Sequence, residues 1–332
     1  MKIAQFASVG QPDQVIECID ADDLGYPKEN EVLIDILAFP INPADVLILE
    51  GKYGVEYKLP SRLGAESVGK VNKIGKNVQG FNVGDIVLPL DRENWVQQKM
   101  VLASNLILLP KNIDPLQSSM MKVNPATAYL MIKKYVKLNK NDWIIQDAAN
   151  SGVGHSIISI AKELGLNTVN IVRREGLEES LKNIGADVVV IDNNDLSKTV
   201  KNLTNNANIK LAIDAVGGDQ VLRIGDCLED EATILNYGLL SGKNIQISSH
   251  QTVFKRLLLT GFWLMPWLQN MDKKEIIEMY SYLSSLIEKN IIHVPVEKTY
   301  PIEDIKKAVA HAAKYGRSGK IIVTPNGENF TS

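Results

Sequence analysis

The sequence predicts an α/β protein with two domains, a compact β-rich domain and a doubly wound parallel sheet. A chain of 332 residues is long for one hydrophobic core, so two domains are expected. Up to about Gln117, short strand-like stretches are separated by glycines and prolines. From about Ser118, helix-like stretches alternate with apolar strand-like runs, which is typical of a parallel sheet covered by helices.

Glycine and valine spacing defines the first domain. The stretch "EVLIDILAFPIN" predicts a strand that ends at Pro40. The stretch "SVGKVNKIGKNVQGFNVGDIVLPL" predicts strand fragments between closely spaced glycines. We therefore assign residues 1–118 to the β-rich domain.

Residues 119–290 are assigned to the parallel-sheet domain. In "HSIISIAKELG", Ile157, Ile158, Ala161 and Leu164 lie on one helical face, and Gly165 ends the helix. The helix "KKEIIEMYSYLSSLIEKN" is expected to close this domain. A final strand, helix and strand should return to the first domain, so residues 291–332 are assigned to it.

Composition excludes several functions. The net charge of −3 gives no basic excess for nucleic acid, and no apolar run reaches the roughly 18 residues that span a membrane. The start "KIAQFA" resembles neither a signal peptide nor a transit peptide, so we expect a cytoplasmic protein. The two cysteines and four histidines lack metal-ligand spacing, which predicts neither a disulfide nor a zinc site.

A nucleotide-binding turn is predicted at residues 146–176. The dinucleotide fingerprint G-x-G-x-x-G lies between a strand and a helix, where the helix N-terminus binds the pyrophosphate. Of its three glycines only the last is present here, and Ala and Ser are the smallest substitutes for the other two, while a further glycine stands between them and the last. The six positions are Ala149, Asn150, Ser151, Gly152, Val153 and Gly154.

The end of the second strand of this unit decides the cofactor. An acidic residue there would bind the ribose hydroxyl of NAD, whereas arginine pairs with the 2′-phosphate of NADP. Arg173 and Arg174 stand at this position, and Glu175 follows as the alternative ribose ligand. We predict NADPH, because Glu175 lies one step beyond the strand end.

Motifs along the whole chain identify a family resemblance. They are "INPAD" (41–45), "GKYG" (51–54), "VNPATAY" (123–129), "AANSGVG" (148–154) and "GFWL" (261–264). With them the chain resembles the zinc-free branch of the medium-chain dehydrogenase/reductase superfamily, and within it the mitochondrial-type trans-2-enoyl-CoA/ACP reductases. The resemblance implies a GroES-like β-barrel catalytic domain and a Rossmann domain.

The positions of the catalytic zinc ligands agree with the zinc-free branch. Zinc-containing relatives carry a cysteine and a histidine at the places that correspond to Pro43 and Ala65 of this chain. The turn "GAES" departs from the "GNEG" of the enoyl reductases, and this departure bears on the substrate range.

The resemblance also implies roles for individual residues. The tyrosine of "GKYG", Tyr53, corresponds to the proton donor, and a neutral tyrosine with a pKa of about 10 can give a proton at neutral pH. From the residues alone, Tyr57 is a nearly equal candidate. The implied cofactor contacts are Asn124, Asn150, Ser151, Gly152, Val153, Gly154, Arg173, Arg174, Tyr237, Gly238, Leu239, Leu240, Phe262, Trp263, Leu264 and Lys320.

The expected reaction is the NADPH-dependent reduction of the C2=C3 bond of a 2-enoyl thioester on CoA or acyl carrier protein. A quinone or 2-alkenal reductase is the alternative enzyme, and an NADPH sensor or RNA-binding protein is the alternative without catalysis. The resemblance implies a homodimer. A basic entrance for the acyl carrier is a further hypothesis, formed by Lys52, Lys58, Arg62, Lys255 and Arg256.

Overall fold

The computed structural model describes residues 1–328 and 330 and divides the chain into two compact units. Unit 1 comprises Met1–Val123 and Lys273–Ser332, and unit 2 comprises Asn124–Asp272. The sequence placed helix α10 (Lys273–Glu288) in the second domain, whereas the structure places it in unit 1. There α10 contacts α3 (Pro115–Ser118), and the Tyr280 hydroxyl donates to the Lys122 carbonyl at 3.0 Å. An apolar stripe predicts that a helix is covered, but not by which domain.

Unit 1 is built from two β-sheets. The smaller has the order β2-β1-β4, and the larger has the order β15-β16-β3-β5-β6-β8, with β7 paired to β3. The strands are β1 (Lys2–Phe6), β2 (Ile16–Asp20), β3 (Glu31–Pro40), β4 (Ser61–Arg62), β5 (Val68–Ile74), β6 (Ile86–Pro89), β7 (Gln98–Leu102), β8 (Leu106–Leu108), β15 (Val296–Tyr300) and β16 (Lys320–Val323). The helices besides α3 and α10 are α1 (Pro12–Val15), α2 (Pro43–Leu49) and α11 (Ile305–Ala312), with 3-10 turns η1 (Ala103–Asn105) and η3 (Ile302–Asp304).

The C-terminal strand joins the sheet formed by the N-terminal part of the chain. Ile322 of β16 lies opposite Pro40 of β3 in antiparallel pairing, which confirms the predicted return of the tail. The helix before it, α11, contributes Ile305 and Val309 to the same core. Both are fully buried because residues four apart share one helical face.

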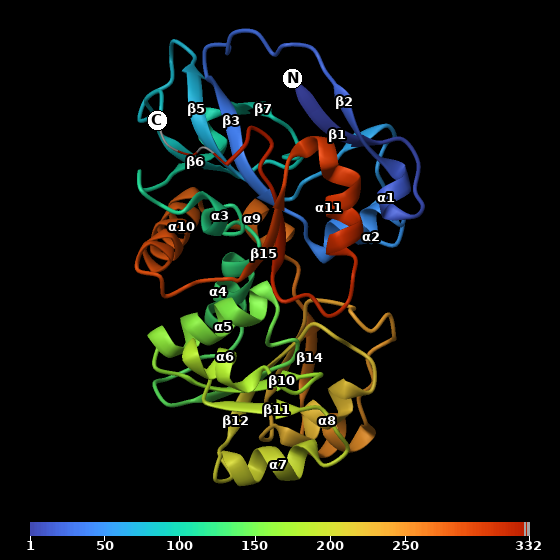
Figure 1. The fold of residues 1–332 in the computed structure, drawn as a ribbon. Coiled ribbons are helices and arrows are strands. Elements are labelled where there is room, and N and C mark those ends of the chain that lie inside the picture. Colours follow the sequence, from blue (N-terminus) through green and yellow to red (C-terminus); the bar gives the residue numbers. More distant parts are fainter. Residues whose placement is uncertain (329, 331–332) are drawn as a thin grey trace. The chain divides into compact units, whose positions relative to one another are not determined.

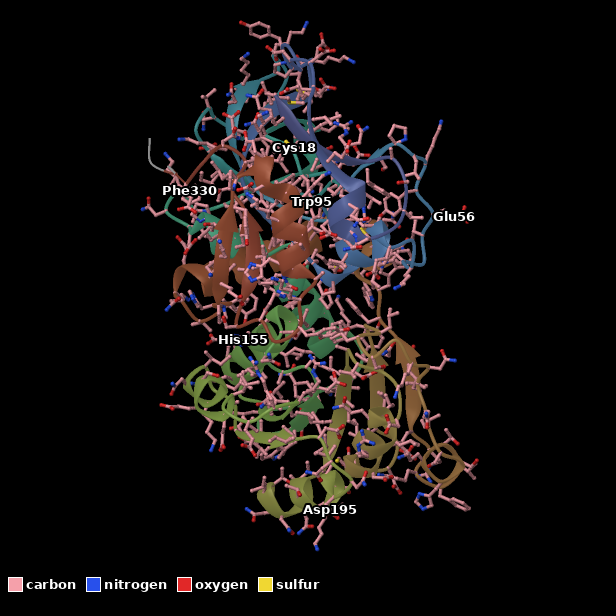
Figure 2. All side chains as sticks on the ribbon, turned by 45° about the vertical axis from the view of Figure 1, so that its right-hand side comes forward. Cys18, Glu56, Trp95, His155, Asp195 and Phe330 are labelled. Carbon is pink, nitrogen blue, oxygen red and sulfur yellow. The ribbon has the colours of Figure 1, made fainter. Side chains whose placement is uncertain are left out.

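An aromatic pair lies in the core of unit 1. Trp95 is completely buried and stacks on Phe39 with ring centroids 5.7 Å apart. Figure 2 shows Trp95 among the densely packed side chains of this unit, whereas Glu56 lies in an exposed loop on its outside. This loop also carries Tyr53 and Tyr57.

Unit 2 is a six-stranded parallel sheet with the order β11-β10-β9-β12-β13-β14, flanked by helices (Figure 1). Its strands are β9 (Trp143–Gln146), β10 (Asn167–Val172), β11 (Val188–Ile191), β12 (Ile209–Asp214), β13 (Thr233–Asn236) and β14 (Leu258–Gly261). Its helices are α4 (Asn124–Lys134), α5 (Gly152–Glu163), α6 (Glu178–Asn183), α7 (Leu196–Leu203), α8 (Gln220–Cys227), the π-helical η2 (His250–Phe254) and α9 (Leu264–Asn270).

The order of these strands is that of a doubly wound nucleotide-binding sheet, which confirms the predicted fold class. The chain leaves β9 in one direction toward β10 and β11 and later continues on the other side from β12. Ligands of such sheets bind at the carboxyl ends of the two strands where the order reverses. In this protein those strands are β9 and β12, which pair with Ile213 opposite Gln146.

Within the part of the chain that the structure describes, no helix has the length and apolar character needed to cross a membrane.

Candidate active site

The turn from β9 to α5 is closely packed around two glycines. The Ser151 hydroxyl caps α5 by accepting the Gly154 N–H at 3.0 Å. A Cβ on Gly154 would lie 2.4 Å from the Ala149 carbonyl oxygen, and one on Gly152 would lie 3.2 Å from the Asn124 amide carbon. The turn therefore requires Gly154, whereas a side chain at Gly152 would press on Asn124, and the unpaired N–H groups at the start of α5 favour an anion.

The other residues predicted in this turn are placed on it by the structure. Asn150 is exposed and Val153 is buried. His155 lies one turn into α5, is buried, and is labelled in Figure 2.

The arginine pair follows β10 directly. Val172 is the last residue of this strand, and Arg173 and Arg174 are both exposed. Glu175 is exposed as well. Two guanidinium groups at the end of the strand next to β9 provide positive charge where the sequence predicts a 2′-phosphate.

Asn124 brings a buried donor to the same turn. It is the first residue of α4 and only 5% exposed, and its Nδ2 has no hydrogen-bond partner among the described residues. Such a donor costs about 1–3 kcal/mol unless an acceptor reaches it. The glycine cradle, this unsatisfied donor and the exposed arginines fit a phosphorylated nicotinamide dinucleotide.

Residues after β13 lie close to the same turn. A Cβ on Gly238 would lie 2.6 Å from the Ala215 carbonyl oxygen. The Tyr237 hydroxyl interacts with Ser151, and burial raises the pKa of this phenol above its ordinary value. Leu239 and Leu240 are exposed.

The segment after β14 splits into buried and exposed side chains. Phe262 and Leu264 are buried, whereas Trp263 is 49% exposed. Phe262 packs edge-on against Tyr135, with ring centroids 6.2 Å apart. Trp263 is therefore the residue of this segment that is available to a ligand.

In unit 1 the two candidate tyrosines have different partners. The Tyr57 hydroxyl accepts a hydrogen bond from the Arg92 guanidinium at 2.6 Å, and burial raises the pKa of Tyr57. Tyr53 is half-buried against the same core, and its hydroxyl has no hydrogen-bond partner within the described residues.

Lys320 is buried in unit 1, with 8% of its surface exposed, and binds Asn42. Its ammonium donates to the Asn42 amide oxygen, and the Asn42 amide nitrogen donates to Glu66 at 2.8 Å. The second Glu66 oxygen accepts the Val123 N–H at 2.7 Å. Burial raises the pKa of Glu66 to about 7 and lowers that of Lys320 to about 8, and each partner opposes the shift of the other. The ammonium predicted to contact the cofactor thus already has a partner inside unit 1.

A second buried lysine, Lys122, was not identified from the sequence. Its ammonium donates to the carbonyl oxygens of Ala65 at 2.6 Å and Asp91 at 2.8 Å. The side chain is 1% exposed, and burial lowers its pKa to about 7. Lys122 immediately precedes a quoted motif, but no periodicity marks a lone lysine as buried.

Glu66, in contrast, had a signal in the sequence. It is the acidic residue of "GAES", and Asn42 with Asp45 belongs to "INPAD". Pro43 and Ala65 carry no side-chain ligand atoms. Among the described residues, no three His, Cys, Asp or Glu side chains are grouped to hold a metal ion.

Two family descriptions match the chain in the expected order. "Alcohol dehydrogenase GroES-like domain" matches residues 28–101, within unit 1. "Zinc-binding dehydrogenase" matches residues 152–282, most of which lie in unit 2. Together with the fold and the glycine turn, these matches define the class of the protein as a medium-chain dehydrogenase/reductase.

Relatives narrow this class. The chain is 34% identical over 327 residues to the mitochondrial enoyl-[acyl-carrier-protein] reductase of Rattus norvegicus, which covers 96% of this chain and 87% of the relative. It is 31% identical over 328 residues to the protein of the same name from Dictyostelium discoideum, covering 96% and 93%. The chain therefore belongs to the enoyl-reductase branch of the medium-chain dehydrogenase/reductase superfamily.

A solved structure agrees with this assignment. The Etr1p structure with NADP and crotonyl-CoA superimposes with a TM-score of 0.85 at 26% identity, covering 97% of this chain and 99% of that chain. Etr1p is a mitochondrial 2-enoyl thioester reductase of Candida tropicalis.

Proposed function

We propose that this protein uses NADPH to reduce the C2=C3 bond of 2-enoyl thioesters, with Tyr53 as the proton donor. The observation that carries the donor assignment is the contrast between the two tyrosines. The Tyr57 hydroxyl is held by Arg92, whereas the Tyr53 hydroxyl has no partner among the described residues. A donor must be able to turn toward the carbon that it protonates.

The reaction balances with one proton from the chain. NADPH, when bound, supplies a hydride to Cβ of the alkene. The electron pair of the double bond moves toward the thioester carbonyl, and Tyr53 then gives its phenolic proton to Cα. The phenolate of Tyr53 regains a proton from solvent.

Unit 2 supplies the residues proposed to hold the cofactor. The start of α5 would accept the pyrophosphate, and Arg173 with Arg174 would pair with the 2′-phosphate. Asn124 would donate its buried amide N–H to the cofactor. The remaining proposed contacts are Asn150, Ser151, Gly152, Val153, Gly154, Tyr237, Gly238, Leu239, Leu240, Phe262, Trp263, Leu264 and Lys320.

The acyl group would be carried by CoA or by acyl carrier protein. The relatives are named for the carrier protein, and Etr1p was solved with crotonyl-CoA. The basic entrance expected for either carrier receives little support, because several of its cations already have partners. Lys52 pairs with Glu50 at 3.1 Å, and Arg62 pairs with Glu93 at 3.2 Å.

The unit 2 members of that entrance are also engaged. Arg256 pairs with Glu231 at 2.9 Å, and the Lys255 ammonium donates to the Gly225 carbonyl at 2.8 Å. Lys58 is exposed and, within the described residues, forms no ion pair.

Replacing Tyr53 by Phe tests the proposed function. With crotonyl-CoA and NADPH, the variant should lose about 100-fold or more in kcat, the usual contribution of a positioned proton donor, while NADPH affinity stays unchanged. The matched control is Tyr57→Phe, which removes the hydroxyl bound to Arg92 and should retain most turnover. Full activity of Tyr53→Phe would contradict the donor assignment. A sensor or RNA-binding protein would show no turnover in any variant.

A quinone reductase is the second candidate. The putative NADPH:quinone reductase of Bacillus thuringiensis superimposes with a TM-score of 0.89 at 28% identity, covering 97% of this chain and 98% of that chain. Comparing NADPH oxidation with crotonyl-CoA, a 2-alkenal and a quinone separates the candidates. If only the quinone is turned over, the substrate is a quinone and the assignment to enoyl thioesters is wrong.

Assembly and location complete the proposal. Strand β14 is at the edge of its sheet and exposes Leu258, and exposed edges favour pairing with another chain. We therefore propose that the protein is a homodimer, and light scattering can measure its oligomeric state. Cytoplasmic location rests on the sequence alone, and cell fractionation can test it.

A further inference from the structure

Two aspartates meet at the point where the strand order of unit 2 reverses. Asp147 directly follows β9, and Asp214 is the last residue of β12, the neighbouring parallel strand. Asp147 is 1% exposed and Asp214 is 0% exposed. Two buried carboxyl groups side by side need an explanation, because charge is costly to bury without a partner.

Three of the four carboxyl oxygen atoms of Asp147 and Asp214 accept hydrogen bonds. The Asp147 Oδ1 accepts the Ala215 N–H at 2.7 Å. The Asp214 Oδ1 accepts the N–H groups of Val216 at 3.1 Å and Gly217 at 2.9 Å, and its Oδ2 accepts the Asn236 amide at 2.6 Å. Asp147 Oδ2 has no donor among the described residues. The polar group that it faces is the carboxyl of Asp214.

Neither aspartate forms an ion pair with any described residue. The charged side chains at the end of β10, Arg173 and Arg174, are exposed. The titratable group that interacts with both aspartates is Tyr237, after β13, whereas α5 carries His155, Lys162 and Glu163 and β12 carries Lys210. Burial and the adjacent Asp214 carboxyl raise the pKa of Asp147 well above its ordinary value.

We propose that Asp147 and Asp214 share one proton, and that this protonated pair positions the two loops that form the proposed nucleotide site. The Asp147 hydroxyl donates to Asp214, so all four oxygen atoms are satisfied. Through their remaining bonds the two side chains fix the start of the β9–α5 turn and the Ala215–Gly217 loop. Tyr237 links the pair to the helix cap at Ser151. Both aspartates act as positioning residues.

The proton makes these loops sensitive to a rise in pH. In the unfolded chain Asp147 would lose its proton near its ordinary pKa, whereas the folded chain keeps it to higher pH. The pair's contribution to stability is therefore full at low pH and is lost as pH rises through the folded value. Once the proton leaves, two adjacent carboxylates repel each other, and cofactor affinity should fall with the geometry of the turn.

Asp147→Asn is the decisive variant. Its amide oxygen can still accept the Ala215 N–H, and its N–H₂ group can donate to Asp214 at any pH. At neutral pH, stability and NADPH affinity should stay within about twofold of wild type, because one donor replaces another. As pH rises through the folded pKa of the pair, wild type should lose affinity and stability while Asp147→Asn keeps them.

Asp214→Asn is the matched control. Both oxygens of Asp214 accept N–H groups, three in total. In the variant an N–H₂ group replaces one of these oxygens and must face an N–H donor. This variant should bind NADPH about tenfold or more weakly at neutral pH, the effect of one unsatisfied buried group. Equal behaviour of the two asparagine variants, or identical pH profiles of wild type and Asp147→Asn, would overturn the proposal.

Infrared spectroscopy of the protein alone gives a readout that needs no cofactor. The difference spectrum of wild type minus Asp147→Asn at neutral pH should contain the carbonyl band of a protonated carboxylic acid, because bands from other buried acids such as Glu66 are common to both proteins and cancel. Absence of this band from the difference spectrum would also overturn the proposal. Failure of every variant to bind NADPH would instead count against the proposed function, on which only the affinity readout depends.

Discussion

The buried carboxyl groups of the two units have opposite surroundings. Glu66 in unit 1 accepts hydrogen bonds on both oxygens, from Asn42 and from the Val123 N–H, and two buried lysines add positive charge. Asp147 in unit 2 accepts on one oxygen and faces another acid with the other. Burial raises the pKa of both groups, but Glu66 is surrounded by donors, whereas Asp147 must itself provide one.

This difference teaches that burial alone does not define the role of an acid. A carboxylate among donors and cations holds a network together through its charge. A carboxyl beside another carboxyl stabilises the structure only through its proton. Removal of a buried acid should therefore have different consequences in the two units.

The largest effect is expected from Glu66→Leu. The change leaves the ammonium of Lys320 buried without its carboxylate, and such uncompensated charges cost about 3–5 kcal/mol. Urea unfolding followed by circular dichroism measures the loss. Glu178→Gln is the control, because its ion pair with Lys182 is exposed and worth less than about 0.5 kcal/mol. If Glu66→Leu lowers the free energy of unfolding by a similarly small amount, the charge of Glu66 does not stabilise unit 1, and the contrast with Asp147 is wrong.

A smaller, pH-dependent effect is expected from Lys122→Met. Burial lowers the pKa of Lys122 from its ordinary value of 10.5 to about 7. Between these two pH values the unfolded chain still binds a proton that the folded chain has released. Wild type should therefore gain stability relative to the variant as pH rises from 7 to 9, by roughly 1–3 kcal/mol.

The measurement for Lys122 is urea unfolding of both proteins across this pH range. The sign is opposite to that expected for Asp147, whose contribution falls as pH rises. A difference between wild type and Lys122→Met that does not change with pH would mean that the ammonium stays charged.

The smallest effect on stability is expected at the exposed end of β10. Replacing Arg173 and Arg174 by Ala should change the free energy of unfolding by less than about 0.5 kcal/mol, as for most surface substitutions. NADPH affinity should nevertheless fall about tenfold or more, since charge-assisted bonds to phosphate are worth about 1.5–3 kcal/mol. Fluorescence titration with NADPH and NADH measures this, and an equal loss for both cofactors would argue against phosphate recognition.

Much of the fold and part of the candidate site were accessible from the sequence. The alternation of strands and helices predicted the parallel sheet, and "AANSGVG" identified the turn before α5. Arg173 and Arg174 were predicted because their position after a strand fixes which end of the sheet they occupy. The domain of α10 was misplaced, since its packing on α3 involves residues far away in the sequence.

The sequence by itself determined the order of elements and the glycine turn, because local spacing and residue size control these features. Only the tertiary structure decided which polar side chains are enclosed and what they face. Glu66, Lys122 and Lys320 come from three distant segments, and Asp147 meets Asp214 across neighbouring strands. Hydrogen bonding and desolvation depend on these long-range neighbours, which no local pattern contains.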